Sequence, residues 1–291
     1  MTRRFLVLVN PSAGGGRALK RLPVALAELE RLGASHRVVR TRSLEDASAQ
    51  AANAAEAGET VAALGGDGLL GGIASALSHT GSALAILPGG RGNDLARVLG
   101  IPTEPAAAAR IAVEGRERMI DVARVDGRPF LGIASFGIDS DANRIANDAR
   151  LVGGNVVYLY AALRALLSWR PAHFTVTVDG EREEITGYSV AMANSRAYGG
   201  GMYIAPEAEL DDGDLDVVTL AGSSKLRCLR LLPKVFKGTH VRSPDVHVRR
   251  GSVVEVAADR PFEVYADGDP VGALPATVSV ESRCLRVIVP V

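Results

Sequence analysis

Residues 60–97 read TVAALGGDGLLGGIASALSHTGSALAILPGGRGNDLAR. Within this stretch two apolar runs, 60–64 and 84–88, each lead into a glycine-rich loop and then into a segment suited to a helix. A short apolar run bounded by glycines is typical of a buried strand, and strands that alternate with helices form βαβ units with a mostly parallel sheet. Ligands of such sheets bind at the carboxyl ends of the strands, where both glycine-rich loops fall. The stretch therefore predicts an α/β fold with a ligand site at its glycines.

The same alternation extends upstream to the start of the sequence. A third glycine-rich loop, NPSAGGG at 10–16, follows an apolar run there, so all three loops come after strands of one predicted sheet. The further elements that the pattern predicts are strands at 5–9 and 36–41 and helices near 16–32, 44–57 and 69–78.

After about residue 121 the sequence changes to short segments in which apolar and polar residues alternate, separated by Gly, Asp and Pro. A period of two predicts antiparallel strands, and hence a second, antiparallel β domain. The strands predicted there are 128–135, 173–180, 187–194, 214–220, 248–258, 260–268 and 277–290, with two helices near 151–169 and 223–237.

Composition restricts the partners and the compartment. The 33 Lys and Arg balance 33 Asp and Glu, so no global field attracts nucleic acid, and none is expected as a partner. Cys228 and Cys284 are far apart and lack metal spacing, which fits a reducing cytoplasm. The apolar run 5–9 is too short for a signal peptide. Because Arg164 and two glycines interrupt the apolar stretch 151–169, a packed helix is expected there instead of a membrane span.

The loop at 10–16 closes the first strand and opens a helix, where backbone N–H groups and the helix dipole favour an anion. It lacks the Lys-Ser/Thr ending of a Walker A loop and the GxGxxG spacing of a dinucleotide fold. The loop Gly65-Gly66-Asp67-Gly68 is more specific, because an acid between glycines that approach a polyphosphate needs a metal ion or a hydroxyl proton to offset the repulsion. The motif is therefore typical of a loop that binds ATP together with Mg²⁺. An ordinary Asp-Gly turn is the alternative.

The third loop, PGGRGNDLAR at 88–97, again joins a strand end to a helix, which Asn93 or Asp94 is suited to cap. Arg91 offers a planar fork for phosphate oxygens, although a surface arginine is the alternative.

These motifs resemble the diacylglycerol kinase catalytic-domain family, which is shared with sphingosine and ceramide kinases and includes the bacterial soluble lipid kinases. The resemblance covers nearly the whole chain, because seven motifs occur in the family's order. They are NPSAGGG, GGDG, PGGRGNDLAR, SFGID (135–139), NSRAYGGGMYIAP (194–206), DDGDLDVV (211–218) and DGDP (267–270). It implies an α/β ATP-binding domain at 1–121 and a β-sandwich lipid-substrate domain at 122–291, with the active site in the cleft between them.

By position, the resemblance also implies a set of nucleotide contacts. Leu69 and Arg91 stand where the family has Thr, which removes two hydroxyls, although the guanidinium of Arg91 can replace one with a stronger phosphate contact. The implied contacts are Asn10, Thr41, Gly65, Gly66, Asp67, Gly68, Leu69, Leu70, Gly71, Arg91, Asn93 and Asp94.

The resemblance further implies a structural Mg²⁺, held by the carboxylate of Asp212 and the main-chain carbonyls of Glu209 and Asp214; a solvated acidic turn is the alternative. Asp269 stands where the family motif DGE has a Glu that is the proposed proton acceptor. Asp269 would then take the proton of the acceptor hydroxyl, while Asp67 organises the catalytic Mg²⁺.

The function predicted is ATP- and Mg²⁺-dependent transfer of a γ-phosphoryl group to a lipid hydroxyl, with diacylglycerol as the favoured acceptor and phosphatidic acid as the product. A sphingosine-, ceramide- or other alcohol kinase and a non-catalytic lipid- or nucleotide-binding protein are alternatives. An NAD-kinase-like enzyme shares GGDG but does not explain YGGGMYIAP or DDGDLDVV.

Residues 225–250 carry eight Lys or Arg against one acid, Asp245, in a chain of zero net charge. An apolar stripe near helical spacing accompanies these cations, and Pro233 must kink or end the helix. The pattern favours a cytoplasmic protein that transiently contacts a membrane surface, with a solvated flank as the alternative. A homodimer is compatible with the sequence, which leaves the oligomeric state open. The stripe consists of Leu226, Leu229, Leu232, Val235 and Phe236.

Overall fold

The computed structural model describes residues 3–138, 140, 145, 160, 163–165, 169–222 and 224–291. They divide into two compact units. Unit 1 comprises the chain up to Val122 together with Glu281–Val291, and unit 2 comprises Ala123–Val280. Most of the helix predicted near 151–169, and Asp139 of the SFGID motif, lie outside the described residues.

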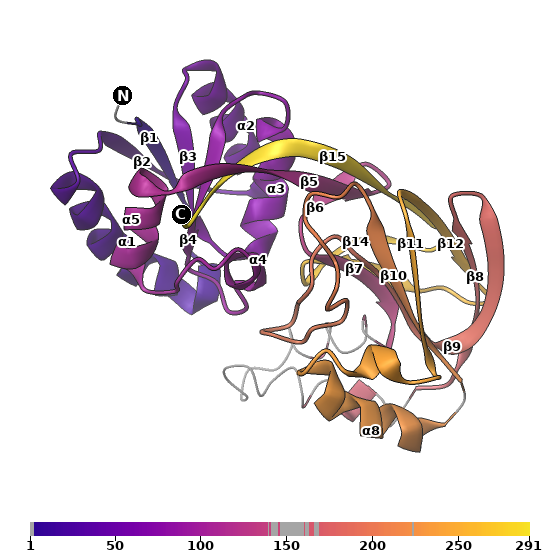
Figure 1. The fold of residues 1–291 in the computed structure, drawn as a ribbon. Coiled ribbons are helices and arrows are strands. Elements are labelled where there is room, and N and C mark those ends of the chain that lie inside the picture. The colour runs from indigo at the N-terminus through magenta and orange to yellow at the C-terminus, as the bar shows by residue number, and fades with distance from the viewer. Residues whose placement is uncertain are drawn as a thin grey trace. The chain divides into compact units, whose positions relative to one another are not determined.

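Unit 1 is the predicted α/β structure (Figure 1). Its strands run in the order β2-β1-β3-β4, all parallel, and β1, β3 and β4 are buried along their whole length, which explains their uninterrupted apolar sequences. The four strands are β1 (Phe5–Val9), β2 (His36–Arg40), β3 (Thr60–Gly65) and β4 (Ala83–Pro88).

Helices pack on both sides of this sheet, α1 with α5 and α2 with α3 (Figure 1). Helices α1, α2 and α3 confirm the three predicted helices. The Ala-rich α5 and strand β5 (Arg116–Val125) were not predicted. The helices are α1 (Ala13–Arg31), α2 (Leu44–Glu56), α3 (Asp67–Leu77), α4 (Asp94–Val98) and α5 (Pro105–Glu114).

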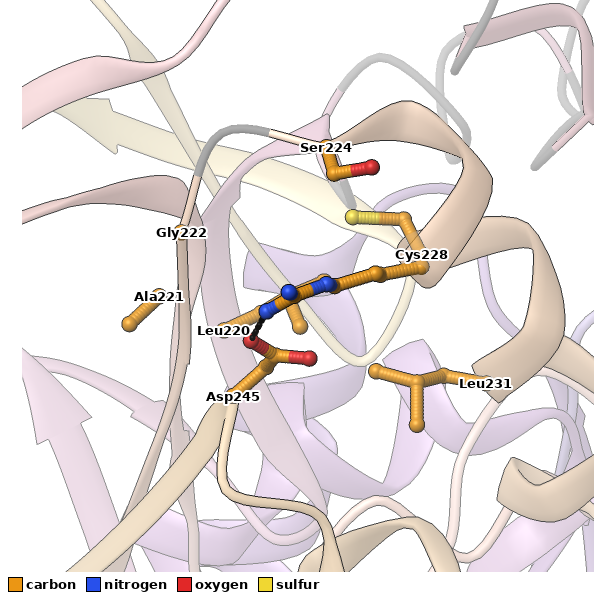
Figure 2. Close-up of a pocket in the computed structure, with 8 residues that line it drawn as sticks. Leu220, Ala221, Gly222, Ser224, Cys228, Leu231 and Asp245 are labelled. Carbon is orange, nitrogen blue, oxygen red and sulfur yellow. Dashed lines mark hydrogen bonds and ion pairs between the residues drawn. The ribbon is translucent and has the colours of Figure 1, made fainter.

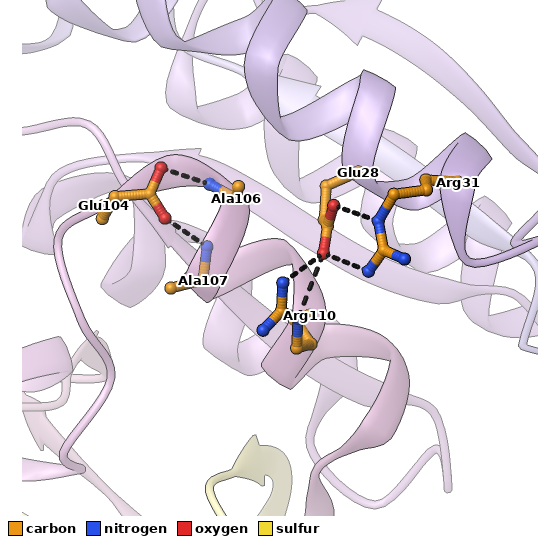
Figure 3. Close-up of polar contacts among 6 residues, drawn as sticks. All are labelled: Glu28, Arg31, Glu104, Ala106, Ala107 and Arg110. Carbon is orange, nitrogen blue, oxygen red and sulfur yellow. Dashed lines mark hydrogen bonds and ion pairs between the residues drawn. The ribbon is translucent and has the colours of Figure 1, made fainter.

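Glu28 on α1 joins the two helices on its side of the sheet (Figure 3). Its carboxylate accepts from Arg31 Nε at 2.7 Å and from Arg110 of α5 at 3.0 Å. The bonds from these arginines lower the pKa of Glu28 from its ordinary 4.5 to about 2. A lowered carboxyl pKa means that the contribution to stability is fully present above pH 4.5 and is lost as the pH falls through about 2.

Unit 2 is the predicted antiparallel β-sandwich, with a core that includes Phe136, Phe174 and Phe262. Two predicted strands each become two. The segment 128–135 is interrupted by a turn at Leu131 and Gly132, and the segment 248–258 is interrupted at Ser252. The strands are β6 (Arg128–Phe130), β7 (Ile133–Gly137), β8 (Ala172–Val178), β9 (Glu181–Ala193), β10 (Leu215–Ala221), β11 (Val246–Gly251), β12 (Val253–Ala258), β13 (Glu263–Ala266) and β14 (Asp269–Ala273).

Strand β15 (Ala276–Val289) changes the expected division of the chain. Its first half pairs with β12 in unit 2, whereas its second half pairs in parallel with β4, with Arg286 opposite Ala83. Residues 281–291 therefore belong to the α/β unit and not to a second domain at 122–291. The pairing joins segments about 200 residues apart, and no local pattern encodes such a contact.

Candidate active site

The three glycine-rich loops meet at the carboxyl ends of β1, β3 and β4. The N–H of Gly89 donates to the carbonyl of Gly65 at 2.7 Å. A Cβ atom on Gly90 would lie 2.5 Å from Cα of Gly66, and one on Gly14 would lie 2.5 Å from the carbonyl oxygen of Gly89. Backbone lies directly against backbone, so larger residues at these positions would force the loops apart.

In the first loop, Asn10 shapes the turn, because its Oδ1 accepts from the N–H of Ser12 at 3.1 Å and from its hydroxyl at 2.8 Å. Gly14, Gly15 and Gly16 then have φ of +60°, +69° and +86°, in the left-handed region that glycine tolerates. Regular helix geometry in α1 therefore begins after Gly16, where the sequence predicted it.

Thr41 lies at the end of β2, beside the first loop. Its N–H and its hydroxyl both donate to the carbonyl of Val9, at 2.9 and 3.2 Å. The side chain expected to contact a nucleotide thus also anchors two strand ends to each other.

Asp67, the acid of GGDG, is the first residue of α3 and also caps α4. Its Oδ2 accepts from the N–H of Asp94 and its Oδ1 from the N–H of Leu95, both at 3.1 Å. Burial raises the pKa of Asp67, although these N–H groups oppose the shift. The two N–H donors do not fully offset the cost of desolvating the negative charge, so a cation beside this carboxylate would be favourable. Asp67 therefore fits a Mg²⁺ ligand or organiser.

Asn93 occupies the N-cap position of α4, as expected, but its side chain makes no capping bond to the helix. Asn93 has φ of +51° and exchanges two hydrogen bonds with Gly90, accepting at 2.8 Å and donating at 3.1 Å. The carboxylate of Asp94 accepts from the guanidinium of Arg97. Arg91 is exposed at the tip of the loop. The side chains of Asn93 and Asp94 thus hold the loop together, and Arg91 is placed to reach outward.

Leu69, Leu70 and Gly71 are buried in α3. Cδ2 of Leu69 would be 2.6 Å from a Cβ atom on Gly65, so this side chain fills the space beneath the glycine. The N–H groups of Leu69 and Leu70 point to the carbonyl of Gly66, at 3.1 and 3.4 Å. The position of Leu69 in the motif indicated a nucleotide contact, but its side chain faces the core.

In unit 2, the motif DGDP places Asp267 where its carboxylate accepts three N–H groups. These are the N–H groups of Leu131 and Gly132, each at 2.9 Å, and of Ile133 at 3.2 Å. Asn194 closes the same turn by donating to the carbonyl of Leu131 at 3.0 Å. The sequence gave these two residues no separate role, although both lie within recognised motifs.

Asp269 follows Gly268 and begins β14. Its side chain is exposed, while desolvation by the protein atoms around it raises the pKa of Asp269. A carboxylate with a raised pKa that solvent can reach suits a proton acceptor.

Acidic side chains gather on the turn before β10. Asp212 accepts from the N–H of Asp214 at 3.1 Å and is paired with the guanidinium of Arg250. Asp216 is only 3% exposed, and its Oδ2 has no hydrogen-bond partner among the described residues. Burial, followed by repulsion from Glu207, Asp214 and Glu209, raises the pKa of Asp216 to about 6.

Several acids thus surround one arginine, whose Nε is 3.7 Å from Oδ2 of Asp216. This excess of negative charge, around a buried carboxylate oxygen whose contact with Arg250 is too long for a hydrogen bond, fits a divalent cation. The sequence singled out Glu209, Asp212 and Asp214 but missed Asp216, whose position directly opposite Arg250 is set by the pairing of β10 with β11.

An α/β unit with three glycine loops at its strand ends, one of which carries Asp67, followed by a β-sandwich, fits the class of enzymes that bind phosphate groups. Residues 4–125 match the family model of the diacylglycerol kinase catalytic domain, and residues 132–289 match that of the YegS C-terminal NAD kinase beta sandwich-like domain. A diacylglycerol kinase of Mycobacterium tuberculosis is 36% identical, over 99% of this chain and 95% of that protein. A diacylglycerol kinase of Bacillus subtilis is 27% identical, over 99% and 97%. The chain therefore belongs to the diacylglycerol kinase family, and it is a lipid kinase.

Two solved structures from Bacillus anthracis have the same fold. Each aligns over 99% of this chain and 97% of its own, with TM-scores of 0.83 and 0.75 at 23% and 21% identity. The second of them is described as a diacylglycerol kinase. Among the described residues, no helix is both long enough and apolar enough to span a membrane.

Proposed function

We propose that this protein transfers the γ-phosphoryl group of ATP to the free hydroxyl of diacylglycerol and produces phosphatidic acid, with Mg²⁺. The observation that carries the proposal is the convergence of three glycine loops at the strand ends, with Asp67 of the second loop bonded to the third. The relatives named diacylglycerol kinase, which match over nearly their whole length, support the choice of acceptor.

Each group of residues has a separate role in the proposed phosphoryl transfer. Backbone N–H groups of the glycine loops and the guanidinium of Arg91 bind phosphate oxygens. Asp67 holds the catalytic Mg²⁺, which neutralises phosphate charge when bound. Asp269 accepts the proton of the lipid hydroxyl as this oxygen attacks the γ-phosphorus. Asn10, Thr41, Asn93 and Asp94 keep the loops in place through the bonds described above.

The test is to incubate the purified protein with γ-labelled ATP, Mg²⁺ and mixed micelles that contain diacylglycerol, a sphingoid base or ceramide. Label on diacylglycerol is the expected result. Label on a sphingoid base or ceramide alone would show that this lipid, and not diacylglycerol, is the acceptor. In parallel incubations with NAD or a soluble alcohol, label on one of these alone would overturn the lipid proposal.

A second, structural Mg²⁺ is proposed at Asp212, with the main-chain carbonyls of Glu209 and Asp214. Without nucleotide, Mg²⁺ is expected to raise the melting temperature of the wild type more than that of Asp212→Ala, because the ion would tie the turn to the sandwich. Differential scanning fluorimetry over a Mg²⁺ series measures this. Glu181→Ala is the matched control, since it removes an acid from the pair with the neighbouring Arg249. If Mg²⁺ raises the melting temperature of the wild type and of Asp212→Ala equally, Asp212 does not bind a structural Mg²⁺.

We also propose that helix α8 (Lys225–Val235) touches an anionic membrane surface. Leu226 and Leu229 are 57% and 43% exposed, on the side of the helix opposite the buried Cys228 and Leu231. Arg230 lies beside these leucines on the helix surface. Exposed apolar side chains among cations suit a helix that lies in a lipid headgroup region.

The structure changes two details of the expected stripe. Val235 is buried, so it belongs to the inner face of α8 and not to the outer one. Of the two effects expected of Pro233, a kink or an end of the helix, the end is not observed, because α8 continues to Val235. Beneath its first turns lies a pocket of about 270 Å³ that is lined by Cys228 and Leu231 and crossed by the ion pair of Arg227 with Asp245 at 3.1 Å (Figure 2).

The double variant Leu226→Asp/Leu229→Asp is expected to bind anionic vesicles roughly tenfold more weakly, because the apolar contact is lost and charge repulsion is added. Vesicle sedimentation measures this. Transfer to a short-chain, water-soluble diacylglycerol should stay near the wild-type rate, while transfer to vesicle-borne diacylglycerol should fall. Val24→Asp, which alters an exposed apolar residue of α1, is the control. Vesicle binding equal to that of the wild type would assign α8 another role.

A further inference from the structure

A cluster of three metal-binding side chains lies in unit 1, apart from the glycine loops. His79, Glu281 and Cys284 each place one ligand atom within 4.8 Å of the other two. Nε2 of His79 is 2.6 Å from Oε1 of Glu281, and the thiol of Cys284 donates to the main-chain carbonyl of Glu281 at 3.4 Å. Nitrogen, oxygen and sulfur donors thus converge from segments 202 positions apart.

Two unusual backbone conformations create this convergence. His79 follows α3 with φ of +59°, and its N–H donates to the carbonyl of Cys284 at 2.8 Å, which fixes the histidine beside β15. Arg283 has φ of +46°, and its N–H donates to the buried carboxylate of Asp121 at 2.6 Å.

The irregularity at Arg283 determines the directions of the neighbouring side chains. In a regular strand, residues three positions apart point to opposite faces. A backbone irregularity within a strand re-aims the side chains around it, so Glu281 and Cys284 approach the same histidine. Cys284 is 2% exposed at the base of the cluster, while His79 and Glu281 are open to solvent.

We propose that His79, Glu281 and Cys284 bind a zinc ion, with water as the fourth ligand. Zinc accepts all three donor types in a tetrahedron with bonds of about 2.0–2.3 Å, whereas Mg²⁺ and Ca²⁺ require oxygen ligands. Small movements of the two exposed side chains bring the donors to that geometry. On binding, zinc replaces the thiol proton of Cys284, and this proton passes to solvent.

The ion has a structural role and takes no part in phosphoryl transfer. It ties the end of α3 to the part of β15 that returns to unit 1, and it stabilises the fold because its ligands, 202 positions apart, come together only in the folded chain. Because zinc displaces the thiol proton of Cys284, its binding is expected to weaken as the pH falls.

The test uses the full-length chain after chelator treatment and dialysis. One equivalent of zinc is expected to bind by calorimetry and to raise the melting temperature. Co²⁺ in its place is expected to show a thiolate-to-cobalt charge-transfer band. His79→Ala and Glu281→Gln, both at exposed positions that leave the core intact, should each weaken zinc binding at least tenfold, and Cys284→Ser should abolish the charge-transfer band.

His36→Ala is the matched control, because His36 is paired with Glu30 at 3.8 Å without a thiol nearby. It should bind zinc like the wild type, as should Cys228→Ser and Asp212→Ala. The absence of stoichiometric zinc binding, or equal affinity in His79→Ala and the wild type, would reduce the cluster to a surface ion pair beside a core cysteine.

Discussion

Asp67→Asn is expected to lower the rate of phosphoryl transfer by about 10³-fold or more. The proposed role of Asp67 is to hold Mg²⁺ against the phosphates, and losing an interaction of several kcal/mol with the transition state has an effect of this size. An amide has the size of the carboxylate but carries no charge. Single-turnover measurement of label transfer to diacylglycerol, at saturating ATP, gives the rate.

The cap that Asp67 provides to α4 makes a stability control necessary. An asparagine can accept one of the two N–H groups of Asp94 and Leu95, but its amide nitrogen would face the other. Glu28→Gln makes the same change at another bonded carboxylate of unit 1, and Arg97→Ala removes the bonds of Arg97 to Asp94 and Gly92 in the loop before α4. Both should lower the melting temperature yet keep the rate of the folded protein within a few-fold of wild type. If they lose activity as severely as Asp67→Asn, Asp67 is a structural cap alone.

The pH profile supplies a further readout for Asp67. Its raised pKa means that the carboxyl group becomes neutral, and unable to hold Mg²⁺, at a higher pH than an ordinary aspartate. Because Mg²⁺ competes with this proton, the Mg²⁺ concentration needed for half-maximal activity should rise as the pH falls. Glu28 has the opposite shift, so its protonation affects stability only at much lower pH.

The parts of the fold that sequence predicts are those encoded locally. Strands β1, β3 and β4 are buried on both faces, so each appears as an uninterrupted apolar run that ends at a glycine loop. Strand β5 begins with RERM, in which Arg116 and Glu117 are exposed, and its sequence shows neither an apolar run nor an alternation of apolar and polar residues. The second half of β15 reads as one more sandwich strand, because its parallel partner β4 is distant in the sequence.

The same distinction applies to the candidate site. Sequence motifs fix which residues stand at the loops, and the structure brings the three loops together as expected. Motifs do not give the direction of a side chain, so Leu69 appeared as a nucleotide contact although it is buried. Nor do they give partners across the fold: the donors to Asp67 lie 27 and 28 positions away, and those to Asp267 lie 134 to 136 positions away.

Asp269→Asn is expected to reduce turnover by roughly 10²–10⁴, with little change in ATP binding, which is the range for loss of a positioned general base. The lipid hydroxyl must shed its proton as it attacks phosphorus, and an amide cannot accept it.

The raised pKa of Asp269 predicts that wild-type turnover declines as the pH falls below that pKa, because the protonated acid cannot act as a base, and that the asparagine variant lacks this decline. Asp269→Glu restores the residue found in the family motif and should keep substantial activity. Asp267→Asn is the informative neighbour: it loosens the turn at Leu131, so it should lower the melting temperature more than Asp269→Asn does. If Asp269→Asn is harmless while Asp67→Asn is inactive, then Asp67 serves as both metal ligand and base.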